Sequence, residues 1–229
     1  MEQQGQSQPE QRAEWLALAL LITFGAWALP MCLYLEVFRS IPKDSRNYLD
    51  STWGLDNVIY LIELAYGLIL AVPTWKRSGL HFGQLRGNVG WVLLVCGSSV
   101  VFAAVVVHPL WPGRGFEKSP IGTWLISPLA QELVFSYLYG RFEPLWPNYV
   151  HHRFRIKQAM VISNLFFAAS HLPGIFDAST GYILLQCIYT FFGGCLVGLA
   201  RQWTGSMFYG TITHMAINAI ACLAEQPRP

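Results

Sequence analysis

Residues 15–35 read WLALALLITFGAWALPMCLYL, an uncharged and mostly apolar run that determines how the rest of the chain is interpreted. The run is longer than the apolar region of about 7–15 residues in a signal peptide. The residues before it are net negative, with Glu2, Glu10 and Glu14 against Arg12, whereas a signal peptide begins with a basic region. Although Ala26-Trp27-Ala28 imitates a cleavage site, the run predicts a membrane span that is retained.

The composition extends this interpretation to the whole chain. Of 229 residues, 53% are hydrophobic and 12% are charged, whereas soluble domains usually carry about 25% charged residues. Polar or Pro- and Gly-rich stretches separate the segments that are apolar enough to be spans. These segments are residues 15–37, 57–75, 88–108, 120–146, 156–172, 181–200 and 206–224. The predicted fold is therefore all-α, a polytopic transmembrane bundle of about seven to eight helices.

The length leaves room for one folded domain, because spans of about 20 residues use up most of the chain. Residues 1–14 are predicted to be a disordered N-terminal tail, and residues 15–229 a single transmembrane domain. A net charge of +2, with no basic run longer than two residues, argues against a nucleic-acid partner. The lipid bilayer is the predicted partner.

Basic residues indicate the orientation. With seven spans, nine of the 15 Lys and Arg residues fall on the N-terminal side of the membrane and six on the other side. We therefore expect a multi-pass protein of the cell's inner or plasma membrane with a cytoplasmic N-terminus. If the chain had one helix more or one fewer, the basic residues that follow that helix would lie on the opposite side of the membrane.

The cysteines indicate packing rather than chemistry. They are five in number, lack Cys-x-x-Cys spacing and lie inside apolar segments. We expect small core side chains, and neither a disulfide framework nor a cysteine-ligated zinc site. The residues are Cys32, Cys96, Cys187, Cys195 and Cys222.

His214 and Asn218 are four residues apart, so on a helix both point to one face about one turn from each other. Two hydrogen-bond donors that converge on a point can form an oxyanion hole. The alternative is that each side chain bonds a backbone group or holds helices together.

Two further embedded groups are candidates for catalysis. His171 follows Phe167 by four residues, and Pro173-Gly174 ends its helix there, where a cavity is expected. Glu132 lies mid-span, where an unpaired carboxylate is costly, and a desolvated carboxylate beside a histidine can act as a general base. Each also has a structural alternative, a hydrogen bond between helices. Glu63, the other embedded acid, is expected to snorkel or bond a neighbouring helix.

These pieces occur in the order found in a known family. Gln131-Glu132, then Phe167-x-x-x-His171, then His214-x-x-x-Asn218 resemble the motifs of the CAAX protease and bacteriocin-processing family (CPBP, also called Abi), which are intramembrane glutamic-type endopeptidases. The resemblance covers residues 118–224. It implies a catalytic core there and a membrane-associated or lipidated protein or peptide as substrate. It implies no cofactor and no metal.

The first motif departs from the family pattern Glu-Glu-x-x-x-Arg at two positions, because Gln131 replaces the first Glu and Ser136 replaces the Arg. Gln cannot accept a proton at neutral pH, so the base at this position is lost. Three explanations remain open. Glu132 has taken over as the base, the chain is an inactive member that binds without cutting, or Gln131 is an engineered Glu→Gln change that traps substrate.

The predicted mechanism combines the residues with the resemblance. Glu132, or a carboxylate at position 131, and His171 polarise a water that attacks a peptide carbonyl, while His214 and Asn218 stabilise the oxyanion. Alternatively, one carboxylate and two histidines form a zinc site, although neither histidine has the His-Glu-x-x-His spacing. A scaffold or a transporter would use the same residues for helix contacts or a permeation path, but no paired broken helices support a transporter.

Overall fold

The computed structural model describes residues 8–45, 56–83, 87–107, 122–173 and 179–223. Within these residues the chain is almost entirely helical, and the strands form one two-stranded hairpin. Four helical stretches of the described chain are long and apolar enough to cross a membrane, namely Gln8–Leu33, Asn57–Ser78, Val89–Val106 and Thr180–Thr204. The predicted all-α membrane fold is confirmed.

The first half of the chain forms three long helices. These are α1 (Gln8–Ser40), α3 (Asp56–Ala71) and α5 (Val89–Phe102). Helix α3 continues through the 3-10 turn η1 (Val72–Thr74) into α4 (Trp75–Ser78), and α5 continues into the π-helical turn η2 (Ala103–Val107).

The second half holds the predicted motifs. A π-helical turn, η4 (Gly122–Ile126), leads into α7 (Ser127–Phe142). The hairpin of β1 (Tyr149–His151) and β2 (Ile156–Lys157) follows, and then α8 (Gln158–Ala169), α9 (Thr180–Thr204) and α10 (Met207–Leu223). Each of the seven predicted segments contains one of the long helices.

Two boundaries differ from the sequence prediction. Helix α1 begins at Gln8, so residues 8–14 of the predicted disordered tail are helical, and residues 1–7 lie outside the described chain. Pro9 is compatible with a first turn, whose N–H groups have no helical partners, and Arg12 Nε donates to Leu145 O at 3.0 Å. The second difference is β2, which begins the predicted 156–172 segment as a strand because it pairs antiparallel with β1.

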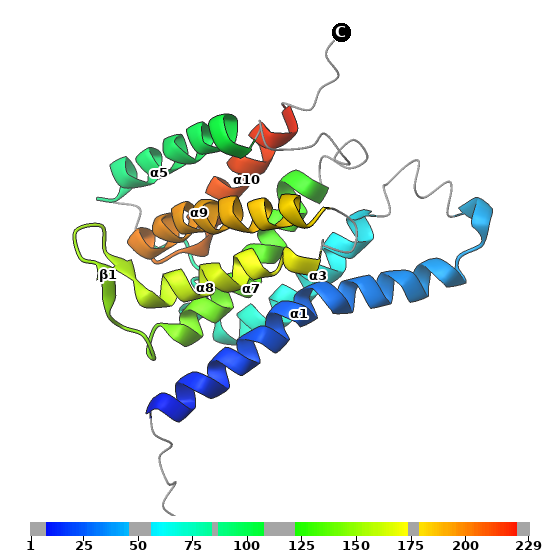
Figure 1. Cartoon of the computed structure of the whole chain (residues 1–229), viewed down its shortest axis with the longest axis horizontal. Coiled ribbons are helices and arrows are strands. Elements are labelled where there is room, and N and C mark those ends of the chain that lie inside the picture. The colour runs from blue at the N-terminus through cyan, green and yellow to red at the C-terminus, as the bar shows by residue number, and fades with distance from the viewer. Residues whose placement is uncertain (1–7, 46–55, 84–86, 108–121, 174–178, 224–229) are drawn as a thin grey trace, which may run out of the picture.

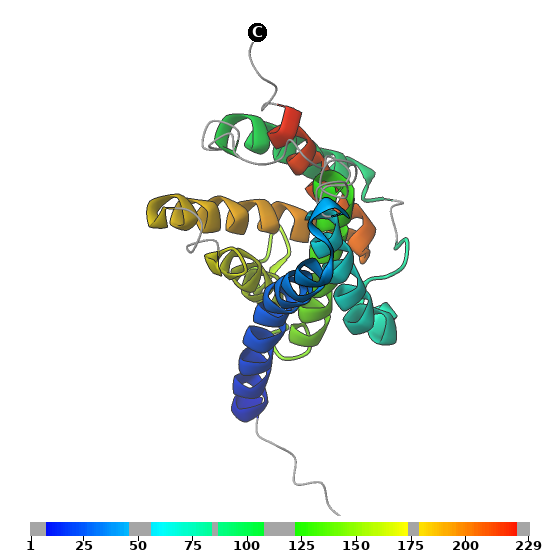
Figure 2. The ribbon, with the colours of Figure 1, turned by 90° about the vertical axis from the view of Figure 1, so that its right-hand side faces the viewer.

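Helix α7 lies in the middle of the bundle and contacts α1, α3, α8 and α10. Helix α9 packs against α5, α8 and α10, while α1 runs along one side of the bundle, as Figures 1 and 2 show. Successive long helices run in alternating directions across the view of Figure 1. The motifs on α7, α8 and α10 are therefore brought together from neighbouring helices.

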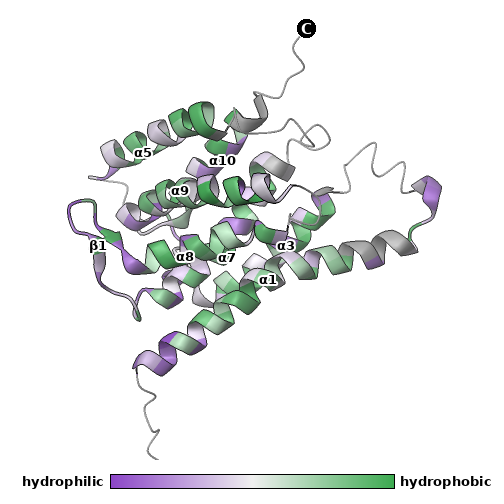
Figure 3. Cartoon of the chain, in the orientation of Figure 1, coloured by the Kyte–Doolittle hydropathy of each residue, from purple (hydrophilic) through white to green (hydrophobic). Residues whose placement is uncertain are grey.

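The interior and the exterior of the bundle are both apolar. Leu138, Phe142 and Met160 are fully buried, whereas Leu21, Ile69 and Leu93 are large apolar side chains that face outward. Figure 3 shows hydrophobic residues along most of the helical surface. A soluble domain of this size rarely exposes so many large apolar side chains, but lipid tails can cover them.

Candidate active site

Gln131 and Glu132 are neighbours on α7 that face different surroundings. Successive residues on a helix point about 100° apart. Gln131 is half-buried and lines a cavity with His171, whereas Glu132 is buried and hydrogen-bonded to His214. The adjacent residues of the first motif therefore belong to two different polar groups.

The first group surrounds a cavity of about 240 Å³. Its polar wall comes from α1, α3, α7, α9 and the turn after α8, and consists of Thr23, Glu63, Gln131, Ser170, His171 and Gln186. Its apolar wall consists of Ala26, Trp27, Ala130, Val134 and Phe135. Since one water occupies about 30 Å³ in the liquid, the cavity is large enough for several waters or for part of a peptide.

His171 is held by the last turn of α8. Its Nδ1 lies 3.1 Å from Phe167 O and 3.4 Å from Ser170 Oγ, while the Ser170 hydroxyl donates to Phe167 O at 2.7 Å. A carbonyl oxygen only accepts, so the contact with Phe167 O assigns a hydrogen to Nδ1. The lone pair of the neutral ring is then on Nε2, where it can accept a proton or a hydrogen bond from water.

The second group is the pair of Glu132 and His214. His214 Nδ1 lies 3.0 Å from Glu132 Oε1, and both side chains are buried. Gly210, one turn before His214, lets α10 pack closely on α9, because a Cβ there would lie 3.2 Å from Val197 O. The predicted pairing of Glu132 with His171 is not among the hydrogen bonds of the described residues, and the carboxylate is instead committed to His214.

Phe167 contacts a histidine of each group. Its ring centroid lies 5.5 Å from that of His171 and 5.5 Å from that of His214, edge to face in both cases. Phe135 packs against the same ring at 4.8 Å. The second and third motifs therefore meet at one aromatic side chain, Phe167. Asn218 lies on α10 one turn after His214 and is half-buried.

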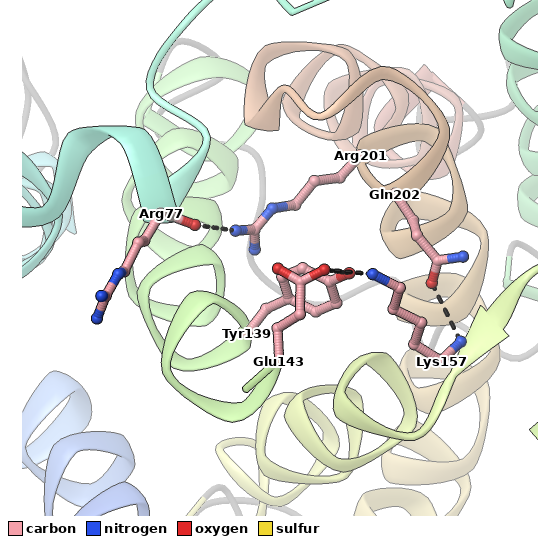
Figure 4. Close-up of polar contacts among 6 residues, drawn as sticks. All are labelled: Arg77, Tyr139, Glu143, Lys157, Arg201 and Gln202. Carbon is pink, nitrogen blue, oxygen red and sulfur yellow. Dashed lines mark hydrogen bonds and ion pairs between the residues drawn. The ribbon is translucent and has the colours of Figure 1, made fainter. Parts of the chain in front are cut away.

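A polar cluster joins α4, α7, β2 and α9 beyond the histidines, and its residues are labelled in Figure 4. The buried Arg201 guanidinium lies 4.3 Å from the centre of the Tyr139 ring, and its Nη2 donates to Arg77 O at 3.1 Å. Lys157 forms an ion pair with Glu143. The cluster fixes the ends of these elements relative to one another.

Arg201 also reaches toward the first motif. It lines a small second cavity together with Glu132 and Ser136. Position 136 carries Ser where the family pattern has Arg, yet a guanidinium enters the same region from α9. A lone arginine near the end of an apolar segment was the signal for this residue, but the sequence interpretation counted it only as a flanking charge.

Sequence reasoning also underestimated the first cavity. Glu63 was expected to be structural, and Thr23, Trp27 and Gln186 were assigned nothing, yet all four line the cavity with His171. Their helices are far from the motifs in sequence, so no local pattern places them there. Among the described residues, no three His, Cys, Asp or Glu side chains lie together so that they could hold a metal ion.

The fold and the site together define a membrane-embedded helical protein whose polar cavity carries a histidine. The family model described as type II CAAX prenyl endopeptidase Rce1-like matches residues 120–220. This match confirms the resemblance predicted from the three motifs, and it supports an intramembrane endopeptidase as the class of the protein. Comparisons with curated proteins and with solved structures give no significant match.

Proposed function

We propose that the protein hydrolyses a peptide bond near the C-terminus of a membrane-associated or lipidated protein. The observation that carries the proposal is that His171 and His214 both pack against Phe167, with His171 at the wall of a cavity. His171 can contact a water in the cavity, whereas His214 is buried next to Phe167 outside the cavity lining, and the proposal assigns to it the substrate oxygen that becomes negatively charged. Peptide hydrolysis needs these two functions.

His171 acts on the water. With Nδ1 bonded to Phe167 O, its Nε2 accepts a hydrogen bond from a water in the cavity and orients an oxygen lone pair toward the substrate carbonyl. The attacking oxygen forms a bond to the carbonyl carbon, and the electrons of the C=O bond move to the oxygen. A base in the cavity takes the proton that the water loses and passes it to the leaving amine, as the carbonyl re-forms and the C–N bond breaks.

His214 and Asn218 stabilise the oxyanion. Because Nδ1 of His214 is bonded to the Glu132 carboxylate, Nε2 is the ring nitrogen left to donate a hydrogen bond to the oxyanion. The Asn218 amide provides a second donor one turn away. The hydrogen bond to His214 thus supports a role for Glu132 in the oxyanion hole rather than as the base.

The substrate class follows from the setting of the cavity. Ala26, Trp27, Val134 and Phe135 give it an apolar wall, and the surrounding helices are apolar enough to lie in lipid. A substrate held in the membrane by a lipid or an apolar segment would reach such a site without leaving the bilayer. The type II CAAX prenyl endopeptidase match is consistent with a prenylated C-terminus.

Cleavage by the protein in liposomes tests the proposal. A fluorogenic peptide with a prenylated C-terminal segment is compared with its unprenylated form. His171→Ala is expected to lower kcat about 10²–10⁴-fold, the usual contribution of acid–base catalysis. His151→Ala removes an exposed histidine of the hairpin and is the matched control with unchanged kcat. Equal rates for His171→Ala and the wild type contradict the mechanism.

Gln131 supports a second candidate function, binding of the same substrates without cleavage. It lines the cavity beside His171 at the position where the family pattern has Glu, and its Nε2 donates to Ser127 Oγ at 3.3 Å. Saturable binding of the peptide with no products at any enzyme concentration would establish this function in place of hydrolysis.

A further inference from the structure

Glu63 is the only carboxylate in the wall of the cavity that holds His171 and Gln131, as far as the described residues extend. It comes from α3, outside the three motifs. One of its oxygens, Oε2, is fully shielded from the surface and has no hydrogen-bond partner in the described part of the protein. An embedded carboxylate oxygen without a partner is unfavourable, and the cavity that Glu63 lines is the place from which a partner can come.

Water is the partner that the cavity can supply. The Thr23 hydroxyl oxygen lines the same cavity and is likewise buried without a hydrogen bond among the described residues. A buried water needs two to four polar neighbours, and Glu63, Thr23 and His171 provide both donors and acceptors. The cavity therefore has the polar groups to hold an ordered water between an acid and a histidine.

The packing of α3 directs Glu63 toward α7. Gly67 follows Glu63 by four residues and so lies on the same face of the helix. A Cβ on Gly67 would be 2.8 Å from Leu133 Cβ and 3.0 Å from Ala130 O, which shows how closely the two helices approach. Tyr66 also fixes α3 against α1, because its hydroxyl donates to Ile22 O at 3.2 Å.

We propose that Glu63 is the general base, and that it supplies from α3 the carboxylate that the first motif lacks at position 131. The inference rests on the proposed peptidase function. Glu63 takes a proton from the water as the water oxygen bonds to the substrate carbonyl carbon and the carbonyl electrons move to its oxygen. When the C–N bond breaks, the same proton passes to the leaving amine, which regenerates the carboxylate and leaves a free acid and amine.

Exchanging the carboxylate between the two positions tests this assignment. The wild type, Glu63→Gln, Gln131→Glu and the double variant are compared for kcat and KM on the prenylated peptide in liposomes. Glu63→Gln is expected to lower kcat at least 100-fold with little change in KM. The double variant is expected to recover at least tenfold of that loss, because a carboxylate returns to the same water. Glu36→Gln, which neutralises an exposed acid of α1, is the control with unchanged kcat.

The outcomes separate this inference from the proposed function. If Glu63→Gln cuts as fast as the wild type while His171→Ala is inactive, the peptidase function stands and Glu63 is not the base. A loss in Glu63→Gln that the double variant does not recover also overturns the assignment. Cleavage by Gln131→Glu but not by the wild type overturns it and identifies the chain as the non-cutting member. Absence of cleavage in all variants overturns both proposals.

Discussion

Among the described residues, the hydrogen-bond partner of Glu132 is His214. Replacement by Leu leaves a buried imidazole nitrogen without its hydrogen bond, which costs about 1–3 kcal/mol of the free energy of unfolding. The proposed oxyanion hole also loses the group that orients the His214 ring, so kcat is expected to fall about 100-fold. Thermal unfolding in detergent and the peptide assay measure the two effects.

Glu132→Gln is the matched control for this residue. Gln has nearly the same size and keeps a hydrogen bond to Nδ1, so its stability loss is expected to be smaller than that of Glu132→Leu. Equal stability of the wild type and Glu132→Leu would show that the hydrogen bond to His214 contributes nothing to the fold.

The sequence predicted the identity of the site residues better than their pairing. His171 and His214 were named from their motifs, and the structure brings both against Phe167. The partner of Glu132 was expected to be His171 and is His214. Residues 131 and 132 point about 100° apart on α7, and only the positions of α8 and α10 decide which histidine each one faces.

At the scale of elements, the packing of α3 against α7 determines the position of Glu63. Gly67→Val introduces a branched side chain where even a Cβ would lie 2.8 Å from Leu133 Cβ, so the helices must separate. Overpacking of this kind costs about 1–3 kcal/mol. Because Glu63 moves with α3, kcat is expected to fall more than stability alone explains. Thermal unfolding and the peptide assay at a temperature where the variant stays folded test this.

Gly97 on α5 provides the control for Gly67. A Cβ at Gly97 would meet no atom within 4 Å, so Gly97→Val tests the same substitution where there is room for it. Unchanged activity in both variants would mean that the spacing of α3 and α7 does not position the cavity wall.

The sequence predicted helices far better than it predicted the hairpin. Every predicted apolar segment contains a helix, because an apolar run of span length has few other stable conformations in lipid. The hairpin of β1 and β2 is short and polar, and it depends on the Lys157 backbone N–H donating to Gln202 Oε1 at 3.2 Å on α9. Because these two residues are 45 positions apart in the sequence, no local sequence pattern predicts the contact.

At the scale of the whole molecule, the set of residues that line the cavity could not be predicted from the sequence. Thr23 on α1, Glu63 on α3 and Gln186 on α9 come together only after the helices have packed around α7. The motifs lie on α7, the end of α8 and α10. A prediction made from these motifs alone therefore omits the cavity residues that come from α1, α3 and α9. The two positions at which the first motif departs from the family are the places where the other helices contribute a carboxylate and a guanidinium.

The path of the chain through the membrane gives the last prediction. In the described part of the chain the long helices run in alternating directions, and the beginning of α1 and the end of α10 lie toward opposite sides of Figure 1. Helix α8 has 12 residues and spans only about 18 Å, less than the hydrocarbon core of about 30 Å, so we expect the turn that carries His171 to complete its crossing. With the basic residues favouring a cytoplasmic N-terminus, a protease added outside intact cells is expected to remove a C-terminal tag and leave an N-terminal tag. Protection of both tags, or removal of both, would mean that α8 turns back within the membrane, which would place the two ends on the same side.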